Sequence, residues 1–94
     1  MTPEELAAAL AELGYSSDVA RIPFPEIREG DDAEAKDYHL VHRSDGRISV
    51  ELPDDRSNKT SVVTWQGAPA VFATADEARD AIYELIKKTK QTYG

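Results

Sequence analysis

The residues of this 94-residue chain that are best suited to metal binding or catalysis are two histidines and two pairs of neighbouring aspartates. His39 and His42 lie three positions apart in a segment that alternates like a β-strand, so they point to opposite faces of a sheet and cannot share one metal ion. The aspartate pairs at positions 31–32 and 54–55 lack the glycine spacing of a calcium-binding loop. The sequence therefore predicts neither a metal site nor a cofactor.

Catalytic patterns are not evident either. The five glycines are isolated, so none belongs to a phosphate-binding loop, and no serine has the strand-to-helix context of a nucleophile elbow. In the hairpin described below, His39 lies opposite Glu51, which favours a cross-strand pair at the surface over a general base. His42 lies toward the apolar face of the same sheet, where we expect a packed, hydrogen-bonded histidine. The sequence therefore predicts a protein that is not an enzyme.

The charge of the chain is negative and unevenly distributed. The formal net charge is −7, and residues 1–37 account for all of it with ten acidic and three basic residues. Residues 38–94 hold eight residues of each sign. A negative field opposes binding to a polyanion such as DNA and favours a partner with a basic surface. The first third of the chain therefore carries the bias toward one class of partner.

Residues 26–37 concentrate this charge in a hydrophilic stretch that we expect to form a loop. Such a loop is either a solvated, mobile connection that keeps a small domain soluble or a contact surface for a basic partner, and the sequence leaves both interpretations open. On the second interpretation an aromatic side chain would anchor the contact, with Tyr83 as an alternative to the tyrosine beside the loop. The candidate partner-binding residues are Glu29, Asp31, Asp32, Glu34, Asp37 and Tyr38.

Capping boxes mark the starts of two helices. Thr2 with Glu5 opens an N-terminal helix that Gly14 ends, and Thr74 with Glu77 opens a longer C-terminal helix. Because the N-terminal helix is short, we expect its apolar face to dock against a core. That face is formed by Leu6, Leu10 and Leu13. The C-terminal helix has an apolar stripe at three- and four-residue steps, formed by Ala78, Ala81, Ile82, Leu85, Ile86 and Thr89.

Residues 38–52 alternate in a way that predicts a β-hairpin, and its turn can be placed. A three-residue loop at 44–46, with Gly46 in the left-handed region, pairs Leu40 with Val50 and His42 with Ile48. This register collects the apolar residues on one face, and a slip of one residue would move them all to the other face. Residues 62–65 predict a third strand, and residues 70–72 predict a short fourth strand or an extended lead into the C-terminal helix.

Together these elements predict an α+β fold in one small domain, residues 1–94. Residues 1–37 form an acidic helix plus an irregular segment, and residues 38–94 form the β-sheet and the C-terminal helix. We expect an antiparallel sheet of three to four strands, with the C-terminal amphipathic helix packed on one face and the other face free to meet solvent. No stretch approaches the ~18 apolar residues of a membrane span, and the N-terminus does not resemble a signal peptide. We therefore expect a cytoplasmic protein that does not bind membranes.

The order of a helix, three strands and a closing helix resembles that of double-stranded-RNA-binding domains. Residues 72–78 are also similar to the strand-to-helix junction of integrase arm-binding and plant AP2-like DNA-binding domains. These resemblances imply a DNA- or RNA-binding domain that would use the sheet face with Arg43 and Arg47. At the start of the last helix, however, the chain has Asp76, Glu77 and Asp80 where double-stranded-RNA-binding domains carry a basic cluster.

A small acidic domain without a catalytic pattern is similar in profile to bacterial immunity proteins, anti-CRISPR-like phage inhibitors and DNA mimics. This similarity implies a non-enzymatic inhibitor that blocks a basic, nucleic-acid-handling protein or complex in phage or bacterial defence. Negative charge would steer it toward the cationic surface of that protein. Protein binding is thus the preferred hypothesis, and direct nucleic-acid binding is the alternative.

The cap at Thr74 yields a prediction about stability. Thr74→Ala should lower the free energy of unfolding by about 1 kcal/mol, because a backbone N–H at the start of the C-terminal helix loses its acceptor. Chemical denaturation of the wild type and the variant measures this difference. An unchanged denaturation midpoint would mean that the helix begins at another residue.

Overall fold

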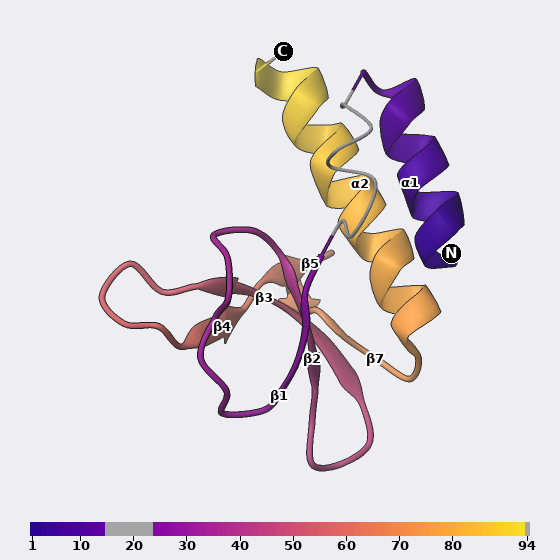
Figure 1. Cartoon of the computed structure of the whole chain (residues 1–94). Helices are drawn as coiled ribbons and strands as arrows, with labels where there is room; N and C mark the ends of the chain where they lie inside the picture. Colours follow the sequence, from indigo (N-terminus) through magenta and orange to yellow (C-terminus); the bar gives the residue numbers. More distant parts are fainter. Residues whose placement is uncertain (15–23, 94) are drawn as a thin grey trace.

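Two helices lie side by side on one side of a β-sheet (Figure 1). The computed structural model describes residues 1–14 and 24–93, and it confirms the expected α+β fold with an N-terminal and a C-terminal helix. Residues 15–23, part of the segment expected to be irregular, lie outside the described residues. The elements in chain order are α1 (Pro3–Glu12), β1 (Glu26–Arg28), β2 (His39–His42), β3 (Ile48–Pro53), β4 (Thr60–Val62), β5 (Thr64–Trp65), β6 (Ala68–Pro69), β7 (Val71–Phe72) and α2 (Ala75–Tyr93).

The sheet is mixed, whereas we expected it to be antiparallel throughout. Its strand order is β1-β2-β3-β4, with β7 also paired to β3, and β5 with β6 forms a separate hairpin. The unexpected strand is β1, which runs parallel to β2 and places Ile27 next to Val41. A strand of three residues with one apolar side chain shows too little alternation to be identified from sequence. Because parallel neighbours cannot be joined by a tight turn, residues 29–38 form a crossover between them.

The hairpin of β2 and β3 has the predicted register. Leu40 lies opposite Val50 and His42 lies opposite Ile48. The turn occupies residues 44–46, and Gly46 has a φ of 86° in the left-handed region. Alternate residues of the two strands therefore face the helices, as the hydrophobic pattern requires.

The hydrophobic core lies between this face of the sheet and the helices. Leu6 and Leu10 are buried in it, which confirms the docking of the short N-terminal helix. α2 contributes Ala78 and Ile82, whereas Leu85 is half-buried and lies outside the core cluster. The contact of α2 with the sheet is therefore centred on Ile82. The buried members of the core are Leu6, Leu10, Phe24, Leu40, Ile48, Val50, Ala70, Ala78 and Ile82.

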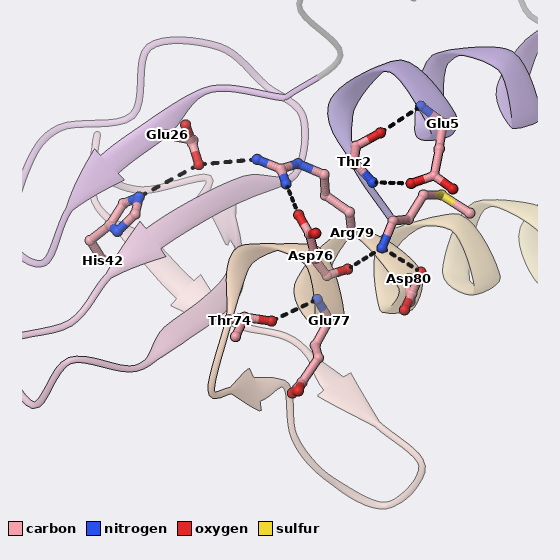
Figure 2. Close-up of polar contacts among 10 residues, drawn as sticks. Thr2, Glu5, Glu26, His42, Thr74, Asp76, Glu77, Arg79 and Asp80 are labelled. Carbon is pink, nitrogen blue, oxygen red and sulfur yellow. Dashed lines mark hydrogen bonds and ion pairs between the residues drawn. The ribbon is translucent and has the colours of Figure 1, made fainter.

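Side-chain caps fix where both helices begin (Figure 2). In α1 the capping box is complete, because the N–H of Glu5 donates to the Thr2 hydroxyl at 3.1 Å and the N–H of Thr2 donates to the Glu5 carboxylate at 2.9 Å. This bond from the backbone N–H of Thr2 favours the ionised carboxylate and lowers the pKa of Glu5 below its usual value. In α2 the N–H of Glu77 donates to the Thr74 hydroxyl at 3.2 Å, while the Glu77 carboxylate points away from Thr74. The second cap thus consists of one of its two predicted bonds.

Arg79 connects α2 to the edge of the sheet (Figure 2). Its guanidinium lies 2.8 Å from the carboxylate of Asp76 on the same helix and 3.4 Å from that of Glu26 on β1. Glu26 in turn lies 3.6 Å from the Nε2 atom of His42 on β2. The Arg79 side chain is 11% exposed, but both carboxylates are about half-exposed, so water screens these pairs. The network therefore positions β1 against α2 without contributing strongly to stability.

The two helices run in the same direction, with their first turns together (Figure 1). The ammonium of Met1 donates to the carbonyl of Asp76 at 3.0 Å and lies 3.1 Å from the carboxylate of Asp80. At the other end, a β-carbon on Gly14 would come within 2.9 Å of the Lys90 ammonium. Parallel helices bring the like ends of their dipoles together, which is unfavourable. The acids at the first turns and Lys90 at the last turns offset this repulsion.

The core predicts different costs for two leucine-sized residues of α2. Ile82→Ala should lower the free energy of unfolding by about 2–5 kcal/mol, because it leaves a cavity at a fully buried position. Leu85→Ala should cost less than about 2 kcal/mol, since Leu85 is half-buried. Denaturant titration of both variants measures the difference. A larger loss at Leu85 would mean that α2 turns another side toward the sheet.

Candidate protein-binding surface

The crossover between β1 and β2 folds over the face of the sheet that points away from the helices. We expected this face to meet solvent, yet four of its residues are buried: His39, Val41, Ser49 and Glu51. Residues 29–31 and the buried Val41 and Glu51 line one hollow of about 220 Å³. Figure 1 shows the connection passing close to β4. The acidic stretch is thus a folded part of the domain that covers buried polar residues.

His39 holds the end of this connection. It is fully buried, its Nδ1 atom donates to the carbonyl of Asp37 at 2.7 Å, and its Nε2 atom accepts from the N–H of Glu34 at 3.2 Å. Because a carbonyl only accepts, this arrangement requires the neutral ring with its proton on Nδ1. His39 does lie opposite Glu51, as the hairpin register predicts, but both residues are buried, so the expectation of a pair at the surface is wrong. His42, which we expected to be packed, is exposed.

Glu51 is buried on the same face, and hydroxyl groups satisfy its carboxylate. One oxygen accepts from the hydroxyl of Ser49 at 2.5 Å, and the other accepts from the hydroxyl of Thr60 at 2.8 Å. Burial of a carboxylate is unfavourable unless such bonds replace its contacts with water. This polar cluster links β3 to β4 beneath the acidic stretch.

A second loop, between β3 and β4, holds the middle of the acidic stretch. The ammonium of Lys59 donates to the carbonyl of Gly30 at 2.5 Å and pairs with the carboxylate of Asp32 at 2.8 Å. The N–H of Ala33 donates to the carbonyl of Asn58 at 2.5 Å. The acidic stretch is therefore attached both to the sheet and to a neighbouring loop.

The five candidate carboxylates are all exposed, but they are not equivalent. Within residues 1–14 and 24–93, the carboxylate of Glu34 makes no hydrogen bond or ion pair, and that of Asp32 pairs with Lys59. The other three accept hydrogen bonds from backbone N–H groups: Glu29 from Ser44 at 2.9 Å, Asp31 from Arg28 at 3.1 Å and Asp37 from Tyr38 at 2.7 Å. Most of these side chains therefore carry charge and shape the loop at once.

A groove of about 640 Å³ opens between the two loops. Glu34, Asp54 and Asp55 supply its acidic groups and Lys36 adds one basic group, while Leu52 and Pro53 add apolar surface. In the sequence, the two aspartates stand out only as a pair that does not fit a calcium loop. The predicted hairpin register could have indicated that these aspartates lie near the acidic stretch. It places the end of β3 beside the start of β2, where the acidic stretch ends. We define the acidic surface as residues 29–37 together with residues 54–55.

This groove is not lined by Tyr38, Arg43 or Arg47, which the sequence also suggested as contact residues. Tyr38 is half-buried, packs against the core and meets the ring of Phe24 edge-on at a centroid distance of 6.2 Å. Arg43 is half-buried and lies 3.9 Å from the carboxylate of Asp45, while Arg47 is exposed. The two arginines are therefore separated by an acid at the hairpin turn and do not form a uniform basic surface.

In the part of the chain that the structure describes, no group of three or more histidine, aspartate or glutamate side chains could hold a metal ion. None of the helices described there is long and apolar enough to cross a membrane. No protein family, curated protein or solved structure matches this chain. The function therefore has to be inferred from the chemistry of the acidic surface.

The two histidines of β2 provide a matched test of the fold beneath this surface. His39→Ala should lower the free energy of unfolding by about 3 kcal/mol, because it leaves a cavity and two backbone groups without their partners. His42→Ala should change it by less than about 0.5 kcal/mol, since His42 is exposed. Chemical denaturation measures both, and equal losses would show that His39 does not hold the acidic stretch.

Proposed function

We propose that this chain is a non-enzymatic inhibitor, of the immunity or anti-CRISPR-like kind, that binds a basic, nucleic-acid-handling protein through its acidic surface. The proposal rests on the presentation of seven exposed carboxylates by two loops that are hydrogen-bonded to each other. A protein that handles nucleic acid uses lysine and arginine to contact phosphates, and carboxylates bind the same groups. An acidic domain seated on those side chains would exclude the nucleic acid.

The balance of charge supports a cationic partner. Residues 29–37 and 54–59 hold seven acidic and three basic residues. One of these bases, Lys59, is already paired with Asp32. The remaining negative charge acts over a distance of about 8 Å at physiological salt and accelerates association with a positive surface.

The internal hydrogen bonds of the acidic stretch support tight binding as well as attraction. Binding is weakened when loops and side chains must become ordered in the complex. Here His39, Lys59 and Asn58 already hold the backbone that carries the carboxylates. The groove beside Glu34 combines carboxylates with apolar surface, which suits the hydrophobic stem and charged head of a lysine or arginine side chain.

A double charge reversal tests this role without disturbing the loop. Glu34 and Asp55 are the acids to change, because within the described residues neither carboxylate makes a hydrogen bond or ion pair. With the partner isolated from the native host by the wild-type chain, Glu34→Lys with Asp55→Lys should slow association by about tenfold or more and reduce its salt dependence. Surface plasmon resonance at several salt concentrations measures both effects.

The matched control is Glu4→Lys with Glu12→Lys on α1, which changes the net charge equally at two exposed positions. It should retain most of the association rate, because its new charges lie on another part of the molecule. If the two variants slowed association equally, the acidic surface would act only through the net charge of the chain and not as a contact surface. The proposal would be overturned if the variant with Glu34→Lys and Asp55→Lys bound the partner as fast as the wild type does.

An electrophoretic mobility shift assay distinguishes this function from direct nucleic-acid binding. The wild type should leave duplex DNA and RNA unshifted at low salt, because its net charge of −7 repels phosphates. A shift that disappears in Arg43→Glu with Arg47→Glu would instead establish the hairpin as a nucleic-acid-binding element.

A further inference from the structure

Two grooves meet at Trp65 on an accessible side of α2. One has a volume of about 290 Å³ and includes Phe72 and Ala81, and the other has a volume of about 450 Å³ and includes Leu85. Trp65 and Glu84 belong to both grooves. Trp65 packs against the core but remains half-buried, so part of its ring lines the surface. This surface was not apparent from the sequence, in which Trp65 reads only as a strand residue.

The short hairpin of β5 and β6 places the tryptophan there. Its two-residue turn sets Gln66 at a φ of 50° and Gly67 at a φ of 80°, and the left-handed region is unfavourable for a residue with a side chain such as Gln66. The pairing of Trp65 with Ala68 offsets part of the conformational cost of the left-handed Gln66. The hairpin thus holds the indole beside α2 at some conformational cost.

Charges along this side of α2 change sign near its middle. Glu77 and Asp80 line the first groove and Lys87 and Lys88 line the second, while Glu84 adds a carboxylate to both. The centres of these two pairs lie about 14 Å apart along the helix axis. The helix dipole accounts for this order of charges, but it does not account for an accessible tryptophan between them. Aromatic side chains flanked by charged groups are typical of protein interfaces.

We propose that this side of α2, with Trp65, is the contact surface between two copies of the chain. A two-fold axis across the middle of α2 sets the two helices antiparallel. Glu77 and Asp80 of one copy then lie opposite Lys87 and Lys88 of the other, and the same contacts repeat on the second side of the axis. The two Trp65 rings lie close to the axis, where the grooves meet. The two Glu84 side chains lie there as well, and their like charges offset part of the attraction between the outer pairs.

Charge balance favours a second copy over a different partner. The whole chain carries a net charge of −7, so two copies attract each other only through a face on which both signs are arranged to match. A strongly cationic partner would meet Lys87 and Lys88 here, whereas the acidic surface offers it carboxylates. The helices and the acidic surface lie on opposite faces of the sheet, so a dimer leaves the acidic surface accessible.

Sedimentation velocity of the purified chain tests the dimer. At high micromolar concentration and low salt the wild type should sediment as a dimer, and added salt should shift it toward the monomer. Lys87→Glu with Lys88→Glu, and Glu77→Lys with Asp80→Lys, should each raise the Kd of the dimer by about tenfold or more, because like charges then meet. An equimolar mixture of these two variants should form a dimer that contains one copy of each.

The matched control is Glu34→Lys with Asp55→Lys, which alters the net charge as much as Glu77→Lys with Asp80→Lys does and should leave the dimer intact. Circular dichroism verifies that each variant is folded, because the changes in α2 oppose its dipole and Asp80→Lys also removes the contact with the Met1 ammonium. If the two α2 variants unfold, the proposal is tested by whether the wild type forms a dimer and whether added salt dissociates it. A monomeric wild type at low salt, a dimer that persists in both α2 variants, or a mixture that remains monomeric would overturn the proposal.

Discussion

The parallel pairing of β1 with β2 determines the arrangement of the rest of this structure. Two parallel neighbours cannot be joined by a tight turn, so residues 29–38 cross the sheet before β2 begins. The crossing uses the face away from the helices, where His39 bonds to two backbone groups of the connection. Acidic residues that would otherwise belong to a free loop are thereby held in one arrangement. The topology of the sheet and the presentation of negative charge are therefore coupled.

Local patterns were sufficient to predict the elements with strong periodicity. The hairpin register followed from the alternation around Gly46, and the helix starts followed from the threonine caps at Thr2 and Thr74. β1 could not be predicted, because one apolar residue, Ile27, gives no period. The burial of His39 could not be predicted from the sequence either. A polar side chain in an alternating strand indicates an exposed face unless another segment is known to cover it.

The candidate site was predicted in composition but not in geometry. Charge counting identified the acids between residues 29 and 37, because it needs no knowledge of the fold. It could not separate Glu34, whose carboxylate is unengaged among the described residues, from Asp31, which bonds to the backbone. It also could not join Asp55 to the same surface or reveal the grooves beside Trp65, since these depend on contacts between segments distant in the sequence.

Asp31 has a consequence for the behaviour of the protein at high concentration. The N–H of Arg28 faces away from β2, because the next residue, Glu29, is the one that donates to the carbonyl of His42. Asp31 accepts this outward N–H and so occupies a place where a strand from another molecule would pair. Unprotected edge strands promote intermolecular β-sheet growth and aggregation. Engineering of the acidic surface at Asp31 therefore risks insolubility, even where the change leaves a single molecule folded.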